Sequence, residues 1–299
     1  MRILVTGAGS NVGKGIVPRL RAAGHDLVLS DLELLPDAAP YAGLPFVQCD
    51  IQAGFGLEGA AQGCDVLLHL PAWHGIHSRS KTEADFWRLN VDGTFWALQA
   101  ARSAGIHRLV FLSSQSWHDH YGKYGFTKQV GEELCEYHRR NHGLRYVAIR
   151  PHDFTPWGDD YLNRYGARLL YGGVDREDVL GYVEAAVEHL GPNLPGGADP
   201  EGLVVDAVRP NVYSEEQVRD WEDDPLAACE RVFPGSRDLI ERYAIDLRRR
   251  PSVVAGGDEG PGAAIGYKPT RHFGTFLDEL RGLDAAGGPD AVHAATCPY

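Results

Sequence analysis

The stretch that decides the fold is Ile3-Leu4-Val5-Thr6-Gly7-Ala8-Gly9-Ser10-Asn11-Val12-Gly13, near the start of the 299-residue chain. Its apolar beginning predicts a strand buried on both faces, and a helical pattern follows it. A glycine-rich turn between a strand and a helix lets main-chain amides approach a pyrophosphate, and the helix N-terminus adds partial positive charge. The residues expected to hold these phosphates are Gly7, Gly9, Ser10, Asn11, Val12 and Gly13.

Short β-rich runs alternate with stretches of helical length through the first half of the chain. The expected strands are Arg2–Val5, Asp26–Ser30, Pro45–Cys49, Val66–Leu70, Arg108–Ser113, Arg145–Arg150 and Leu203–Val208. The expected helices are Val12–Ala23, Thr82–Ala104, Thr127–Asn141, Val174–Leu190 and a short one near Phe273–Leu283. This alternation predicts a doubly wound, parallel α/β sheet of the Rossmann type.

The pattern also divides the chain into two domains. Residues 1–150 plus about 174–208 are expected to form the dinucleotide-binding domain. Residues 151–173 plus 209–283 are expected to form a small, mostly helical substrate-binding subdomain, and 284–299 a poorly ordered tail.

Composition excludes several classes of partner. The net charge of -12 would repel phosphate backbones and anionic membranes, so no nucleic acid or membrane partner is expected. The five cysteines lie far apart and form no C-x-x-C pair, which argues against a disulfide framework or a thiolate zinc site. Neither a signal peptide nor an apolar run of about 20 residues is evident. We expect a cytoplasmic protein.

Asp31 ends the second expected strand, where a carboxylate would accept hydrogen bonds from the ribose hydroxyls of a dinucleotide. The same charge would repel the 2′-phosphate of NADP, and no Lys or Arg follows until Arg79. The sequence therefore predicts NAD as the cofactor.

A phenol and an ammonium group, Tyr124 and Lys128, lie one helical turn apart in the only Y-x-x-x-K of the chain. A nearby Lys⁺ favours the phenolate, so the pair predicts a general base. Ser114, at the carboxyl end of the fifth strand, is expected to hydrogen-bond the reacting oxygen, with Ser116 as the substitute.

Histidines and tryptophans cluster on the same predicted edge, in Trp73-His74-Gly75-Ile76-His77 and Trp117-His118-Asp119-His120. Indole faces and imidazoles suit a carbohydrate, so His74, His77 and His118 are expected to bind substrate. His152 joins them as a further substrate residue, with Asp153 beside it. A metal site is the alternative, since His and Asp are good ligands. No metal is expected, because Tyr124 and Lys128 already supply the acid and base.

The order of these motifs resembles that of the extended short-chain dehydrogenase/reductases, the NAD-dependent epimerase/dehydratase family, which acts mostly on sugars and sugar nucleotides. The motifs that carry the resemblance are residues 6–13, Cys49-Asp50-Ile51, His69-Leu70-Pro71-Ala72, Asn90-Val91-Asp92-Gly93-Thr94, Ser113-Ser114 and Tyr124-x-x-x-Lys128, with a looser likeness at Ile265–Thr270. The resemblance implies that Asp50 and Ile51 lie beside the adenine. It places Leu70, Pro71 and Ala72 along the ribose and nicotinamide, and Lys128 on the nicotinamide ribose.

The sequence departs from the family pattern in three places. Ser10 replaces the usual second glycine of the turn, and only nine residues separate Ser114 from Tyr124. The segment between Pro151 and Val174, which usually clamps a nucleotide diphosphate, is very short and offers only Arg164 and Arg168 as cations. In that brevity the chain is similar to uronate dehydrogenases, which oxidise free sugar acids.

These features predict an NAD-dependent oxidoreductase acting on a small free sugar, sugar acid or polyol. The alternatives are a sugar or sugar-nucleotide epimerase with tightly bound NAD, and a non-catalytic NAD-sensing regulator. The helices over Thr82–Ala104 and Thr127–Asn141 are expected to form a homodimer seam, with packing inside one subunit as the alternative. Asn90 is expected either to anchor its helix or to bind a proton-relay water, and Arg248-Arg249-Arg250 to be a solvated face.

Overall fold

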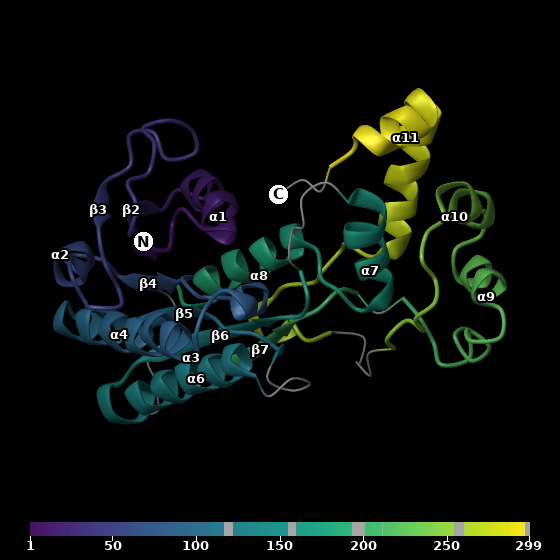
Figure 1. The fold of residues 1–299 in the computed structure, drawn as a ribbon. Helices are drawn as coiled ribbons and strands as arrows, with labels where there is room; N and C mark the ends of the chain where they lie inside the picture. Colours follow the sequence, from purple (N-terminus) through teal and green to yellow (C-terminus); the bar gives the residue numbers. More distant parts are fainter. Residues whose placement is uncertain (117–121, 155–159, 193–200, 211, 254–259, 297–299) are drawn as a thin grey trace. The chain divides into compact units, whose positions relative to one another are not determined.

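The computed structural model describes all residues except 117–121, 155–159, 193–200, 211, 254–259 and 297–299 (Figure 1). Within the described residues, seven strands form one sheet in the order β3-β2-β1-β4-β5-β6-β7. Their bounds are β1 Arg2–Thr6, β2 Asp26–Asp31, β3 Phe46–Gln48, β4 Val66–His69, β5 Arg108–Leu112, β6 Arg145–Pro151 and β7 Gly202–Ala207. The registers of β1 to β6 are parallel. The doubly wound α/β sheet expected from the sequence is confirmed.

The strand order reverses between β1 and β4, which lie side by side in the middle of the sheet. The chain builds outward from β1 through β2 and β3, then returns and builds outward again from β4. In open α/β sheets this reversal leaves a crevice at the carboxyl ends of the strands, where ligands bind. The fold therefore predicts a ligand site at the loops that follow β1 and β4.

Helices cover both faces of the sheet (Figure 1). On one face α1 (Asn11–Ala22) lies beside α8 (Arg176–His189), and an ion pair of 3.6 Å joins Arg19 to Glu184. The other face carries α2 (Leu57–Ala61), α4 (Gly93–Ser103) and α6 (Lys123–His142). These helices bury small and apolar residues against the sheet, among them Ala97, Leu98 and Cys135.

The helix expected over Thr82–Ala104 is present but not uniform. It consists of α3 (Glu83–Phe86), a π-helical turn over Trp87–Asp92, and α4. Thr82 begins it with a capping box, in which Thr82 Oγ1 accepts from the Asp85 amide and the Asp85 carboxylate accepts from the Thr82 amide. π-Helical turns often occur at functional sites, and this one contains Asn90.

Two other helices extend beyond their expected bounds. Helix α6 begins at Lys123, so Tyr124 lies in its first turn and not ahead of it. Helix α11 runs from Phe273 to Ala294. The expectation of a poorly ordered tail from residue 284 was therefore wrong for residues 284–294. Gly288 (φ 60°, ψ −149°) is not helical, so two helical segments meet at a kink within this range.

The chain forms two compact units, each described here by itself. Unit 1 comprises Met1–Pro151 and Tyr182–Asp206, and unit 2 comprises His152–Gly181 and Ala207–Tyr299. Unit 2 contains a π-helical turn over Tyr161–Gly166, then α7 (Ala167–Tyr171), α9 (Pro225–Val232), α10 (Arg237–Tyr243) and α11. Its own core packs aromatic side chains such as Trp221, Phe273 and Phe276. Among the described residues, no helix has both the length and the apolar character needed to cross a membrane.

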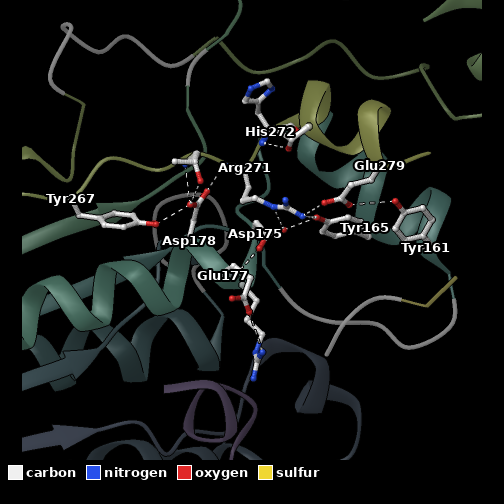
Figure 2. A network of polar contacts seen from close by, with 12 residues as sticks. Tyr161, Tyr165, Asp175, Glu177, Asp178, Tyr267, Arg271, His272 and Glu279 are labelled. Carbon is white, nitrogen blue, oxygen red and sulfur yellow. Dashed lines mark hydrogen bonds and ion pairs between the residues drawn. The ribbon is translucent and has the colours of Figure 1, made fainter. Parts of the chain in front are cut away.

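Unit 2 also contains a polar network around two buried carboxylates (Figure 2). Asp178 accepts hydrogen bonds from the amides of Thr270 and Arg271, at 3.0 and 2.9 Å, and from the Tyr267 hydroxyl at 2.9 Å. Asp175 accepts from the Tyr165 hydroxyl at 2.7 Å. These bonds fix the segment before α11 to the start of α8, although the two lie far apart in the sequence.

Replacing Asp178 with alanine should destabilise the protein by about 2–3 kcal/mol, because two amides and a hydroxyl lose a buried, charged acceptor. Chemical denaturation followed by circular dichroism measures this loss. Asp278→Ala is the matched control, because its exposed ion pair with Arg281 should contribute less than about 1 kcal/mol. Equal stability of the two variants would contradict a structural role for Asp178.

Candidate functional site

A cavity of about 550 Å³ opens in unit 1, at the loops that follow β1, β2, β3 and β4. Its volume is in the range of small-molecule and cofactor sites. The residues predicted from the sequence to bind cofactor that line it are Gly7, Gly9, Ser10, Asp31, Asp50, Ile51, Pro71 and Ala72. Residues widely separated in the sequence thus meet at the strand-order reversal, where the topology predicts a ligand.

The other predicted phosphate-turn residues, Asn11, Val12 and Gly13, are not among the residues that line this cavity, and neither is Leu70. Gly13 is buried so close to the turn that an added Cβ would lie 2.3 Å from the Ala8 carbonyl oxygen. Ser10 is the N-cap of α1, and its hydroxyl accepts from the Gly13 amide at 3.1 Å. The serine in place of the usual glycine therefore has a capping function.

The glycines of the turn after β1 lie so close to neighbouring residues that they leave no room for side chains. Gly7 has a φ of +72°, and a Cβ there would meet the Pro71 ring at 2.9 Å. At Gly9 an added Cβ would lie 3.1 Å from Asp31 Oδ2. Because Gly7 and Gly9 have no side chains, the backbone of the turn is accessible to a pyrophosphate at the N-terminus of α1.

The Asp31 carboxylate is oriented by two backbone amides. Its Oδ2 accepts from Gly9 at 2.8 Å, and its Oδ1 accepts from Leu32 at 2.8 Å. Because these bonds hold the carboxylate at the wall of the cavity, it meets the requirement for pairing with ribose hydroxyls.

Several residues that line the cavity were not predicted from the sequence. Lys14 lines the cavity from the first turn of α1, and Glu33, Leu35 and Tyr41 line it from the loop between β2 and β3. The signal for Lys14 was available, because a cation directly after Gly13 lies near the expected phosphates. The loop residues carried no such signal, because their approach depends on the tertiary fold.

Helix α6 places Tyr124 and Lys128 one turn apart, as the sequence predicts. The Lys128 ammonium is buried and donates to the Leu112 carbonyl at 2.6 Å. Burial lowers the pKa of Lys128 to about 7, although the nearby Glu132 carboxylate opposes this shift.

The Tyr124 phenol is protonated in the cofactor-free protein. Burial raises its pKa to about 12, against the opposing effect of a hydrogen bond with the Ser114 side chain. Desolvation of the phenolate outweighs this contact. The phenolate held jointly by Lys128 and the positive charge of the nicotinamide stays a prediction for the protein with NAD bound.

Both candidate serines follow β5. Besides its bond with Tyr124, Ser114 accepts from the Ser116 amide through Oγ at 3.0 Å. Ser114 is thus the serine that contacts Tyr124, and the Ser116 amide donates to its hydroxyl oxygen.

Under this pair lies a buried ionic group. Glu132 accepts hydrogen bonds from the Ser113 hydroxyl and from the Arg150 guanidinium, the latter at 2.8 Å from Nε. Because Tyr124, Lys128 and Glu132 recur at intervals of four, they share one face of α6. Through Glu132, this face of α6 also contacts Arg150 of β6.

The loop after β4 brings two histidines to the same place. Asn90, in the π-helical turn, accepts from the Trp73 amide at 2.8 Å and donates to the Trp73 carbonyl at 3.1 Å and to Thr127 Oγ1 at 2.9 Å. Asn90 thus anchors the loop after β4 and contacts α6, and its role with a proton-relay water stays a prediction. So anchored, the loop places His74 Nδ1 3.5 Å from Tyr124 Oη.

His77 lies next to His74, and its Nδ1 accepts from the His74 amide at 3.0 Å. Burial, chiefly, lowers the pKa of both imidazoles, that of His74 to about 3. His118 lies outside the described residues. His152 and Asp153 belong to unit 2, where Asp153 pairs with Arg168. Across the described ranges, no group of three or more His, Cys, Asp or Glu side chains is arranged to hold a metal.

Comparison with known proteins gives matches over most of the chain. Residues 3–160 match the model of the NAD dependent epimerase/dehydratase family. A uronate dehydrogenase of Pseudomonas putida is 25% identical over 270 residues, which are 84% of this chain and 90% of that protein. A UDP-glucose 4-epimerase of Streptomyces lividans is 32% identical over 259 residues, 84% of this chain and 72% of that protein.

Solved structures show the same fold. A short-chain dehydrogenase/reductase superfamily protein of Agrobacterium tumefaciens with bound NAD aligns with a TM-score of 0.65 at 20% identity. The alignment covers 96% of this chain and 98% of that one.

Replacing Asp31 with alanine should reduce the preference for NAD over NADP by about 10- to 100-fold, because it removes a charged acceptor from the ribose and the repulsion of a 2′-phosphate. Calorimetric titration of each dinucleotide measures the ratio of dissociation constants. A thermal melt of the variant serves as the control, since Asp31 also binds two amides. An unchanged ratio in a folded variant would contradict this role.

Proposed function

Because this chain belongs to the NAD dependent epimerase/dehydratase family, we propose that it is a dehydrogenase that oxidises a small free sugar, sugar acid or other polyol with NAD. Membership in the family makes the chain an NAD-dependent enzyme of the extended short-chain dehydrogenase/reductase type. Non-catalytic sensing is the weaker alternative, since sensing requires neither Tyr124 nor Lys128.

The cofactor would lie in the cavity lined by the phosphate turn, with Asp31 at the adenosine ribose. Gly7, Gly9, Ser10, Asn11, Val12 and Gly13 would form the pyrophosphate turn, with Asp50 and Ile51 at the adenine and Leu70, Pro71 and Ala72 along the ribose and nicotinamide. When bound, NAD supplies the hydride acceptor and a positive charge next to the reacting carbon. Lys128 would bind the nicotinamide ribose and add a second positive charge near Tyr124.

In this proposal Tyr124 is the general base, and its Oη takes the proton of the substrate hydroxyl. Ser114, which already hydrogen-bonds Tyr124, orients the substrate oxygen. His74 and His77, with Ser116, His118 and His152, are the proposed contacts for the other hydroxyls of the substrate.

The observation that carries the choice of a small, unactivated substrate is the pairing of the two cations in the short segment after β6. Arg168 pairs with Asp153, and Arg164 lies 3.8 Å from Asp160. These carboxylates offset the charge of the two arginines, so the segment offers a nucleotide diphosphate no net positive charge. The similarity to a uronate dehydrogenase along 90% of that protein's length supports the same choice.

An epimerase is the second candidate function, and the 32% identity to a UDP-glucose 4-epimerase favours it. Such an enzyme returns the hydride to the opposite face of the same carbon and keeps its NAD. It therefore forms isomers of the sugar without net NADH.

A panel of uronates, aldoses, polyols and UDP-sugars, each incubated with the protein and NAD, tests the proposal through the absorbance of NADH. Net NADH with a uronate, aldose or polyol is the expected result. Isomers without net NADH would instead indicate the epimerase, and binding of NAD without any reaction would indicate a sensor.

Replacing Tyr124 with phenylalanine should lower kcat at least about 1000-fold while the dissociation constant of NAD stays within about threefold, because only the proton acceptor is lost. Steady-state kinetics and calorimetric titration give the two values. A variant that kept its activity would remove Tyr124 as the base.

We also propose that the protein is a homodimer in which α4 and α6 of each copy pack together. Large apolar side chains remain exposed on and beside these helices, including Trp87, Trp96, Phe126 and Tyr137 at 44, 41, 37 and 54% exposure. A groove of about 380 Å³ adjoins Trp96. Clustered exposed aromatic residues are typical of protein interfaces.

Trp96→Glu should weaken the dimer by at least about 100-fold, because pairing would bury a carboxylate without a partner. Sedimentation velocity at several concentrations measures the dissociation constant. Arg21→Glu, on α1 at the other face of the sheet, is the control and should leave the constant unchanged. A wild-type protein that sediments as a monomer would reject the proposed dimer.

A cytoplasmic location belongs to the same proposal. Cys49, Cys64, Cys135 and Cys229 are free and buried, which suits a reducing compartment. The net charge of -12 supports a small-molecule partner over nucleic acid.

A further inference from the structure

His74 stands beside the reacting oxygen of Tyr124. Its Nδ1 lies 3.5 Å from Tyr124 Oη, and the two ring centroids are 5.6 Å apart. This is long for a hydrogen bond, but catalytic hydrogen bonds often tighten only when the substrate is bound. A shortening of this contact by less than about 1 Å would bring the two atoms to the distance of an ordinary hydrogen bond.

The loop that carries His74 is fixed by its backbone. Asn90 binds both the amide and the carbonyl of Trp73, and His77 Nδ1 accepts from the His74 amide. Because an amide can only donate, His77 Nδ1 must be unprotonated. These backbone contacts position the His74 imidazole against Tyr124.

Burial and the neighbouring charges keep the His74 imidazole neutral. Burial, then the Lys128 ammonium of α6, then His77 of its own loop lower the pKa of His74 to about 3. Tyr124 faces it as a phenol, because burial raises the pKa of Tyr124 to about 12. The described contact is therefore between a neutral acceptor and a protonated donor at neutral pH.

Lys128 and His74 differ in what they contact. Lys128 Nζ donates to the Leu112 carbonyl at 2.6 Å. His74 Nδ1 is the group that lies 3.5 Å from Tyr124 Oη, so the phenol proton has an acceptor there.

We propose that His74 is a further catalytic residue, which takes the Tyr124 phenol proton through Nδ1 while Tyr124 Oη takes the proton of the substrate hydroxyl. This inference rests on the proposed oxidation. The substrate C–H bond breaks, and its electron pair leaves as hydride to the nicotinamide of NAD. The hydroxyl oxygen forms the second bond of a carbonyl, its proton goes to Oη, and the former phenol proton goes to Nδ1. His74 then releases one proton to water, so that each turnover yields one proton and one NADH.

The His74 imidazole is a stronger base than the carbonyl oxygen that forms in the reaction. Once hydride leaves, the proton would otherwise stay on a carbonyl oxygen, which is a far weaker base than imidazole even when the imidazole is buried. The same burial that disfavours the imidazolium also speeds its discharge. His74 is therefore suited to a transient proton and not to a stable one.

His74→Asn provides the kinetic test, because the amide oxygen can accept the Tyr124 hydrogen bond but takes no proton. We expect kcat to fall about 100-fold with KM within about threefold. The rise of kcat with pH should move to more alkaline pH, since Tyr124 must then ionise unaided. Imidazole added to His74→Ala should restore part of the activity. His107→Asn, which removes an exposed imidazole elsewhere, should leave all these values unchanged.

A test without cofactor or substrate uses the nitrogen resonances of the histidine rings. Long-range ¹H–¹⁵N spectra of the cofactor-free protein near pH 7 should show His74 with its proton on Nε2, and Tyr124→Phe should shift the His74 Nδ1 resonance. The His74→Asn variant assigns these signals. This test remains decisive even if no sugar is oxidised, a result that would reject the proposed function alone.

Three results would overturn the role of His74. One is an unchanged kcat and pH profile in His74→Asn with a raised KM, which indicates substrate binding only. Another is a proton on Nδ1 in the cofactor-free protein. The third is a His74 Nδ1 resonance that is insensitive to Tyr124→Phe.

Discussion

The burial of the Lys128 ammonium is the constraint on which the candidate site depends. Removing a charge from water is costly, and here the Leu112 carbonyl and the nearby Glu132 carboxylate offset part of that cost. Glu132 in turn is held by Ser113, which follows β5, and by Arg150, which lies in β6. The lysine can therefore occupy this position only when α6 is packed against both strands. Tyr124, one turn earlier on the same face, is placed by that packing.

The first turn and the loop after β4 are constrained in a different way, by lack of space. Gly7 lies against Pro71, and Gly13 lies against the Ala8 carbonyl, so that neither position can accept a Cβ without displacement. Because β1 and β4 are adjacent, this contact also determines where the loop after β4 begins. His74 then reaches Tyr124 because Asn90 holds Trp73. The position of one imidazole thus depends on glycine packing, a π-helical turn and helix α6 together.

The sequence was sufficient for what depends on local pattern. Apolar runs identified the strands, and the positions of the glycine turn, Asp31 and the Tyr124–Lys128 pair allowed the cavity and the candidate base to be located. The raised pKa of Tyr124 in the cofactor-free protein could not be predicted, because it depends on burial and not on spacing. Lys14 was overlooked although its position after Gly13 was visible, whereas the contact between His74 and Tyr124 joins residues 50 positions apart. In α11, the second helical segment, which follows the kink at Gly288 and reaches Ala294, was not predicted from the sequence.

The network around Asp178 has a consequence for how the chain is made. Its hydrogen-bond partners lie 89 to 93 positions later in the sequence. While the ribosome is still extending the chain toward Tyr267, the carboxylate has none of these donors and must remain hydrated. The central sheet through β6 can assemble as its strands emerge, since domains generally fold from the N-terminal side during synthesis. Unit 2, by contrast, closes around its buried carboxylates only when nearly the whole polypeptide has been translated.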